Sequence, residues 1–136
     1  MQYSLYTDGG SRGNPGPSAL GFVIYNGDEV VEKKGEYLGV ITNNQAEYTA
    51  LVEGLRAARH HRISELSVCM DSELIIKQMK GEYRVKDSKL IPLFHLAKEI
   101  ASEFDHVTYT HVRREKNTVA DAMVNEALDH HLATKR

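Results

Sequence analysis

The sequence predicts a single α/β domain in which helices flank a five-stranded mixed sheet, in the order βββαβααβα. Three observations lead to this class. The length of 136 residues is typical of one domain, and 41% hydrophobic residues are enough to build a core. Three strand patterns precede the first helical pattern, which favours antiparallel pairing. Strand and helix patterns then alternate, which favours parallel strands joined by right-handed crossovers.

Turn residues separate the first three predicted strands. Apolar and polar residues alternate over 3–8, which predicts the first strand. An irregular loop is expected over 9–17, because four of the ten glycines and two of the three prolines lie there. Two further strands are predicted over 20–25 and 30–38, with turn residues at 26–28 between them.

The later elements follow from apolar residues at helical or alternating spacing. They are, in order, a helix over 43–60, a strand over 66–71, a short helix over 74–79, a helix over 93–104, a strand over 106–112 and a helix over 117–132. Asn43 or Asn44 can serve as the N-cap of the first helix. The domain is expected to span residues 1–132, with a short C-terminal tail at 133–136.

Charge and cysteine content narrow the class of protein. With 17 basic and 19 acidic residues the net charge is -2, so any nucleic-acid site must be built from local basic clusters. The single Cys69 excludes an internal disulfide and suits a reducing compartment. No signal core precedes Asp8, and no stretch has the roughly 18 apolar residues of a membrane span. We expect a cytoplasmic, monomeric protein with no membrane partner.

Two acidic residues stand where predicted strands end. Asp8 closes the first strand and Asp71 closes the fourth. If these strands are parallel neighbours, both carboxylates emerge at one edge of the sheet, where ligands of α/β sheets bind. The alternatives are a turn role for Asp8 before Gly9 and a helix-capping role for Asp71 beside Ser72.

Two further acids lie on the apolar faces of predicted helices. Glu47 points the same way as Leu51 and Ala58, so an acid interrupts the buried stripe of its helix. Asp121 shares a face with Val124 in the last helix, although a place in the first turn also suits the helix dipole.

Four acids gathered at one edge need a cation. Two carboxylates 4 Å apart repel by about 4 kcal/mol at an effective dielectric constant of 20. Oxygen ligands without a histidine or cysteine at metal-ligand spacing favour Mg²⁺ or Mn²⁺ over zinc.

Four segments carry these acids in a recognisable order: residues 6–16, 42–47, 70–73 and 117–121. This pattern resembles the type 1 ribonuclease H family over nearly the whole chain. The resemblance implies the ribonuclease H fold and an endonuclease that hydrolyses the RNA strand of RNA-DNA hybrids, leaving 5'-phosphate and 3'-hydroxyl ends. The basic protrusion and the amino-terminal hybrid-binding domain of some members are not expected here.

The resemblance also implies roles for individual residues. The acids Asp8, Glu47, Asp71 and Asp121 match the four that bind two Mg²⁺ ions, for which Mn²⁺ is a possible substitute. The positions that match hybrid-contacting residues are Gly9, Gly10, Ser11, Asn14, Asn43, Asn44 and Gln45. Polar amides there can read 2'-hydroxyls across the minor groove of the hybrid. Ordinary loop and cap hydrogen bonding is the alternative for the polar members of this set.

The catalytic histidine of many family members has no clear match. Only eight residues separate Val112 from Asp121, so the loop that would carry it is short. His111 has a suitable spacing, but the alternation over 106–112 places it in a strand. Shorter members share Val-x-Arg-x-x-Asn before the last acid. Arg114 is therefore the candidate to stabilise charge at the scissile phosphate, with a solvated loop arginine as the alternative.

A basic segment follows the third acid. Its members are Lys77, Lys80, Arg84, Lys86 and Lys89. They can bind phosphates with marked salt dependence or form an ordinary solvated face. Two other functions stay open for the whole chain: a ribonuclease H-like module that binds nucleic acid without cutting it, and a nuclease for another phosphodiester. The complete set of acids argues against the non-catalytic module.

Overall fold

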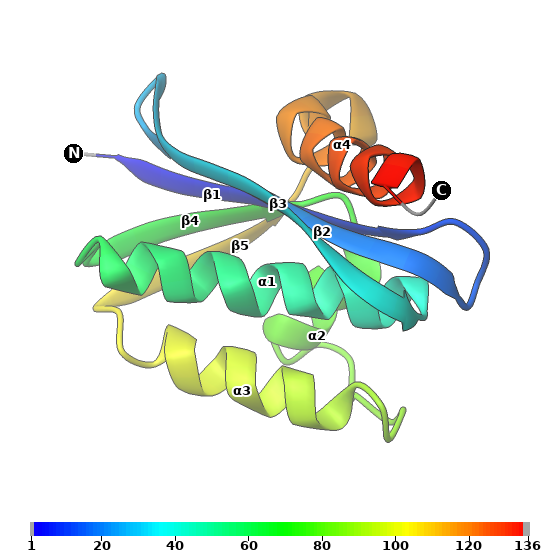
Figure 1. The fold of residues 1–136 in the computed structure, drawn as a ribbon. Helices are drawn as coiled ribbons and strands as arrows, with labels where there is room; N and C mark the ends of the chain where they lie inside the picture. The colour runs from blue at the N-terminus through cyan, green and yellow to red at the C-terminus, as the bar shows by residue number, and fades with distance from the viewer. Residues whose placement is uncertain (1, 135–136) are drawn as a thin grey trace.

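The computed structural model describes residues 2–134 and has the predicted order of strands and helices (Figure 1). Its elements are β1 (Tyr3–Ser11), β2 (Gly16–Asn26), β3 (Glu29–Ile41), α1 (Asn43–His60), β4 (Glu65–Met70), α2 (Glu73–Met79), α3 (Ile91–Ala101), β5 (His106–His111), the 3-10 turn η1 (Arg114–Lys116) and α4 (Thr118–Thr134). The expected domain boundary at residue 132 falls inside α4, and residues 135–136 of the expected tail lie outside the described residues. None of the helices described over 2–134 has the length and apolar character needed to span a membrane.

The five strands form one mixed sheet in the order β3-β2-β1-β4-β5. The first three strands pair antiparallel, whereas β4 pairs parallel with both β1 and β5. This arrangement confirms the predicted fold class. It also makes β1 and β4 parallel neighbours, so their carboxyl ends lie at the same edge of the sheet.

The long loop expected over 9–17 is wrong. Gly9 and Gly10 continue β1, so Asp8 lies within this strand and does not close it as expected. The two glycines pair with Leu20 and Ala19, while β2 begins at Gly16. Glycine and proline content suggested a loop, but these glycines are strand residues. The backbone of α1 approaches Gly9 closely, and the Val124 side chain of α4 lies over Gly10. The connection between the two strands shrinks to residues 12–15.

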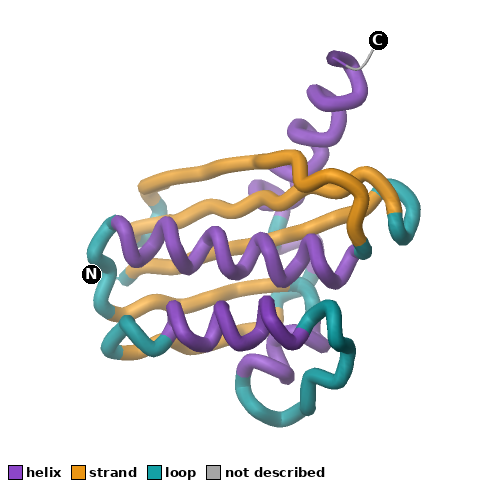
Figure 2. Tube along the Cα trace, turned by 60° about the horizontal axis from the view of Figure 1, so that its bottom comes forward, coloured by secondary structure: helices purple, strands orange, loops and turns teal. Residues whose placement is uncertain are grey.

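The helices form a layer on each face of the sheet. Figures 1 and 2 show α1 and α3 side by side over one face, whereas α4 lies against the other. The main core fills the space beneath α1 and α3, and a smaller cluster of Ala19, Val124 and Leu128 lies beneath α4. The edge that carries the ends of β1 and β4 is therefore bordered by helices from both layers.

The N-cap of α1 is Thr42, so the expectation of Asn43 or Asn44 is wrong. The Gln45 N–H donates to the Thr42 hydroxyl at 3.2 Å, and the Thr42 N–H donates to the Gln45 side-chain oxygen at 2.9 Å. This reciprocal capping box satisfies two otherwise free N–H groups, which neither asparagine does from within the first turn. The start of α1 is thus held next to the end of β3.

Candidate active site

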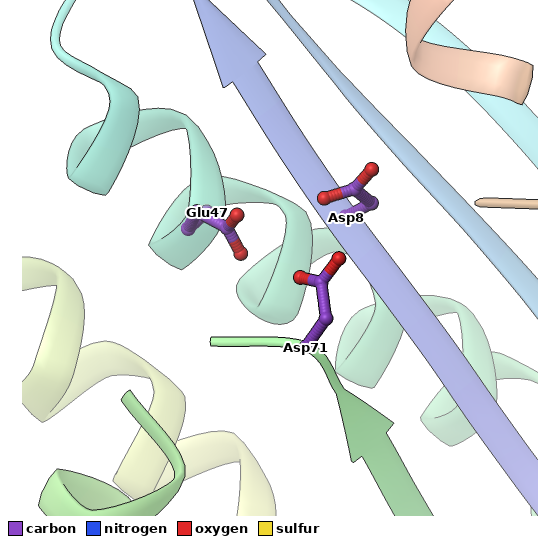
Figure 3. Close-up of side chains that lie close together, drawn as sticks. All are labelled: Asp8, Glu47 and Asp71. Carbon is purple, nitrogen blue, oxygen red and sulfur yellow. The ribbon is translucent and has the colours of Figure 1, made fainter. Parts of the chain in front are cut away.

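Three carboxylates meet at the edge of the sheet. Asp8 comes from β1, Glu47 from the first turns of α1 and Asp71 from the residue after β4, and their ligand atoms lie within 4.8 Å of one another (Figure 3). The parallel register explains two of them, because Thr7 pairs with Met70 and the next residue of each strand is an acid. A turn or capping role alone does not account for this meeting point.

Gly9 brings the third carboxylate into reach. A Cβ atom at Gly9 would lie 2.3–2.4 Å from the backbone of Ala46 and Glu47, so β1 and α1 touch through their main chains at this point. Only glycine permits that approach. The Gly9 N–H donates to Oδ1 of Asp8 at 3.0 Å. Gly9 therefore lets α1 bring Glu47 close to Asp8, and its N–H is already hydrogen-bonded to the Asp8 carboxylate.

Burial and mutual repulsion hold protons on this cluster. Burial raises the pKa of Asp8 to about 8, with further contributions from the neighbouring Asp71 and Asp121 carboxylates, while the Gly9 N–H acts in the opposite direction. Burial, followed by Asp8 and Asp71, also raises the pKa of Glu47 well above its ordinary value. For Asp71, burial raises the pKa and the nearby Arg114 charge partly offsets that rise.

The cluster has the donor set of a cation site. Oε2 of Glu47 is buried and has no hydrogen-bond partner, and the Glu47 residue is only 7% exposed. A buried carboxylate oxygen without a partner is costly unless a proton or a cation approaches it. All the converging atoms are carboxylate oxygens, which suits a hard divalent cation. The residues present therefore fit divalent-metal binding.

The raised pKa of Asp8 predicts how the metal-free protein responds to pH. Between about pH 4 and pH 8 the folded state binds more protons than the unfolded state, so stability must fall as the pH rises through this range. In EDTA, we expect the melting temperature to decrease from pH 5 to pH 8. The Asp8→Asn variant should show a flatter profile, because its side chain does not titrate. Equal slopes for the two proteins would contradict the prediction.

Asp121 and Arg114 border the same hollow on the α4 side. The hollow has a volume of about 420 Å³ and contains all four acids, Gly9, Gly10, Ser11, Asn43 and Arg114 in its lining. The guanidinium of Arg114, in η1, lies 3.9 Å from Oδ1 of Asp121, and its side chain is 81% exposed. Arg114 is thus an exposed positive charge at the mouth of the acidic cluster.

His111 is the last residue of β5, as the strand pattern predicted. It pairs with Met70, and its Nδ1 atom lies 4.0 Å from Oε2 of Glu73. Its charge, when protonated, also lowers the pKa of Asp71 slightly, after Arg114. The histidine therefore lies beside the cluster but is held by a strand, whereas Arg114 lies on a turn.

Four of the seven predicted hybrid-contacting residues line the hollow: Gly9, Gly10, Ser11 and Asn43. The Ser11 N–H donates to the Asn43 side chain at 3.2 Å, and the Asn43 N–H donates to the Asn14 side chain at 3.1 Å. Asn44 is exposed, and Gln45 is engaged in the capping box. Asn14, Asn44 and Gln45 do not line the hollow itself. Their contacts with a nucleic acid stay predictions.

Two residues at this site were not given a role from the sequence. Arg12 lines the hollow and bridges the β1–β2 connection to α4 through Asp129, at 2.8 Å. Asn117 is buried and donates from Nδ2 to the Thr7 carbonyl at 2.9 Å, while its backbone carbonyl accepts the Asp121 N–H at 3.1 Å. The spacing of four residues between Asn117 and Asp121 was the available signal, since it is that of one helical turn.

Replacing Asn117 by alanine should therefore destabilise the protein. The change leaves the Thr7 carbonyl without its partner in a buried place, which costs about 1–3 kcal/mol of unfolding free energy. Urea titration measures the loss. Asn125→Ala is the matched control, because Asn125 lies on α4, which Asn117 immediately precedes, is exposed and donates to the Asp121 carbonyl at 3.2 Å. A similar loss in both variants would contradict a special role for the buried amide.

The sheet order, the helices on both faces and the acids that follow the last paired residues of β1 and β4 define the class of ribonuclease H-like domains. A family model described as "Reverse transcriptase-like" matches residues 6–127. The chain belongs to the type 1 ribonuclease H family.

Three comparisons illustrate this membership. Ribonuclease HI of Halobacterium salinarum is 44% identical over 91% of this chain and 63% of its own length. A bifunctional protein of Mycobacterium tuberculosis is 40% identical over 95% of this chain and 36% of its own length. The crystal structure of LC11-RNase H1 in complex with an RNA/DNA hybrid has a TM-score of 0.92 and 40% identity, covering 96% of this chain and 99% of that one. The chain thus spans between about a third and about two thirds of the length of the two curated relatives, from Mycobacterium tuberculosis and Halobacterium salinarum.

Proposed function

We propose that this protein is an endonuclease that hydrolyses the RNA strand of RNA-DNA hybrids and leaves 5'-phosphate and 3'-hydroxyl ends. The observation that carries the proposal is the meeting of Asp8, Glu47 and Asp71 within 4.8 Å in a hollow that also contains Asp121 and Arg114. Support comes from a relative named ribonuclease HI and from LC11-RNase H1, which was crystallised with a hybrid.

The metal proposed for this site is Mg²⁺, as two ions, with Mn²⁺ as a possible substitute. Asp8, Glu47, Asp71 and Asp121 would hold them through carboxylate oxygens, which are the ligands that Mg²⁺ prefers. When bound, such a pair activates the attacking water and stabilises the departing 3'-oxygen. The unpartnered Oε2 of Glu47 and the protons retained on Asp8 support a site that is completed by cations.

The side chains that do not hold metal would contact the substrate or stabilise negative charge on it. Arg114 would stabilise negative charge on the scissile phosphate, since guanidinium stays protonated at all working pH values. Gly10, Ser11, Asn14, Asn43 and Asn44 would contact the sugar-phosphate backbone, and Gln45 would act mainly by holding the start of α1. The basic segment would add salt-dependent attraction for phosphates through its exposed members Lys80, Arg84, Lys86 and Lys89.

A monomer in the cytoplasm is the proposed physical state. All four acids come from one chain, so a second copy is not needed to complete the site. Cys69 is a free, buried thiol, which suits a reducing compartment. Sedimentation velocity at micromolar concentration tests the monomer, and cell fractionation tests the location.

The decisive experiment compares three end-labelled substrates of the same sequence: an RNA-DNA hybrid, an RNA duplex and a DNA duplex. We expect cutting of the RNA strand in the hybrid alone, in Mg²⁺ or Mn²⁺, and complete loss of cutting in excess EDTA. Binding of the hybrid without cutting would indicate a non-catalytic module. Cutting of either duplex would indicate a different phosphodiester substrate, and cutting in EDTA would contradict metal dependence.

A further inference from the structure

The α4 face of the sheet carries a row of residues that the proposed function does not yet use. Asp8 pairs with Gly21 across β1 and β2, and Gly21 pairs with Gly35 across β2 and β3. Residues paired in this way project their side chains to the same face of a sheet. The row therefore has one carboxylate at its β1 end and two positions without side chains beyond it.

The backbone of α4 lies directly on the two glycines. A Cβ atom at Gly21 would lie 2.3 Å from the Ala120 carbonyl oxygen, 2.9 Å from Cβ of Met123 and 3.0 Å from the Val124 nitrogen. A Cβ atom at Gly35 would lie 2.3 Å from the Met123 carbonyl oxygen. Glycine inside a strand often marks such a close approach of another backbone. Here the approach occurs at two neighbouring strands and at two carbonyls one turn apart.

The part of α4 that touches this row is the part that carries an acid of the site. Ala120 immediately precedes Asp121, whose carboxylate neighbours Asp8 at the β1 end of the row. Asn117 ties the start of the helix to the Thr7 carbonyl. With the start of the helix held there, the distance between helix and sheet at Gly21 and Gly35 sets how far Asp121 lies from Asp8.

We infer that Gly21 and Gly35 are positioning residues for Asp121, and that they act by letting α4 rest on the sheet backbone. The inference rests on the proposed function, because it assigns these glycines a role in the geometry of the same acidic site. It differs from a purely structural role in one respect. A folded protein with a side chain at either position should have a displaced Asp121 and slower chemistry.

The size of the displacement follows from the contacts. A Cβ atom cannot approach a carbonyl oxygen closer than about 3.0 Å, so the 2.3 Å contact at Gly21 must open by several tenths of an ångström. A misplacement of about 1 Å can cost about 100-fold in rate. We expect Gly21→Ala to lower kcat about 10- to 100-fold, with KM within about threefold, because Gly10, Ser11 and Asn43 belong to β1 and α1. Gly35→Ala should have the same effect to a smaller degree.

Gly54→Ala is the matched control on the opposite face. The atoms nearest to a Cβ atom at Gly54 in α1 would be side-chain carbons of Leu5 and Thr7 at 2.9–3.1 Å, rather than the backbone of a neighbouring element. We expect its kcat to stay within about threefold of the parent value. All variants are assayed at a temperature where circular dichroism shows them folded.

A rescue separates positioning from general damage. Asp121→Glu lengthens the side chain by one methylene, so it should lower kcat in the parent but raise it when combined with Gly21→Ala, where the helix has moved away from Asp8. A crystal structure of metal-free Gly35→Ala gives a readout independent of activity: the carbonyls of Ala120 and Met123 should lie farther from the sheet.

The outcomes are distinct. Folded Gly21→Ala and Gly35→Ala proteins with parental kcat, or an unmoved α4 in the crystal, would overturn the inference. Failure of both variants to fold would also overturn it in favour of a role in the fold alone. If Gly21→Ala alone fails to fold, Gly35→Ala decides. A parent protein that does not cut the hybrid would refute the proposed function instead, and the crystal structure would still test the displacement.

Discussion

Replacing Asp71 by asparagine should abolish cleavage of an RNA-DNA hybrid while leaving the metal-free protein at least as stable as the parent. Burial raises the pKa of Asp71, which means that its ionised form is unfavourable in the folded protein. A neutral amide of similar volume removes that unfavourable charge. The same change removes a proposed metal-holding oxygen. We expect kcat to fall at least about 1000-fold, the upper end of the cost of losing one preorganised charge-stabilising group.

Two measurements on the same preparation test this prediction. Turnover is measured at saturating hybrid in Mg²⁺, and the melting temperature is measured in EDTA at pH 8. Glu47→Gln should behave in the same way, because its Oε2 atom has no partner to lose. Asp28→Asn, an exposed turn residue between β2 and β3, is the control and should change neither quantity. A large fall in melting temperature for Asp71→Asn would show that the acid serves the fold.

Arg114→Ala should damage catalysis more than His111→Ala does. Arg114 lies on a turn at the mouth of the hollow, 3.9 Å from Asp121, and its charge reaches Asp71. Loss of one charge-stabilising group predicts a fall in kcat of about 10- to 1000-fold. His111 is held at the end of β5 beside Glu73, so its loss should cost less than about 10-fold, below the usual contribution of a proton-transfer group.

The neighbouring arginine provides the control for charge. Arg113 has an 83% exposed side chain that lies 4.0 Å from Glu115. Arg113→Ala therefore removes the same positive charge while Arg114 stays in place. Assays at saturating hybrid separate kcat from KM, since a simple phosphate contact would raise KM alone. A rate that titrates near neutral pH and is lost in His111→Ala would assign proton transfer to that histidine. Greater damage in His111→Ala than in Arg114→Ala would reverse our assignment.

Local sequence patterns were sufficient for the order of the elements and for the candidate acids. Strand alternation and helical spacing are properties of neighbouring residues, so they identify β1 and α1 without knowledge of the rest of the chain. Helical spacing also reveals an acid on the apolar stripe of a helix, such as Glu47, because the stripe is defined by neighbouring residues in the sequence. The mixture of antiparallel and parallel pairing was accessible too, because the change from hairpin-like to alternating patterns limits the possible connections.

The close contacts between elements were decided only in the tertiary structure. Gly9 and Gly10 read as loop residues, yet they are strand residues because α1 and α4 pack against that part of the sheet. Thr42, rather than the following asparagines, caps α1 because its backbone is still extended, whereas Asn43 and Asn44 already belong to the helix.

The sequence by itself determined which residues are acidic, the order of strands and helices and which family the pattern resembles, because these depend on composition and spacing along the chain. The tertiary structure decided how close the acids come, which of their oxygens lack a partner and where Arg114 and Asn117 lie. These features depend on packing between residues such as Thr7 and Asn117, 110 positions apart in the chain. Local periodicity contains no information about such distances, whereas dense packing of two helical layers on a twisted sheet sets them.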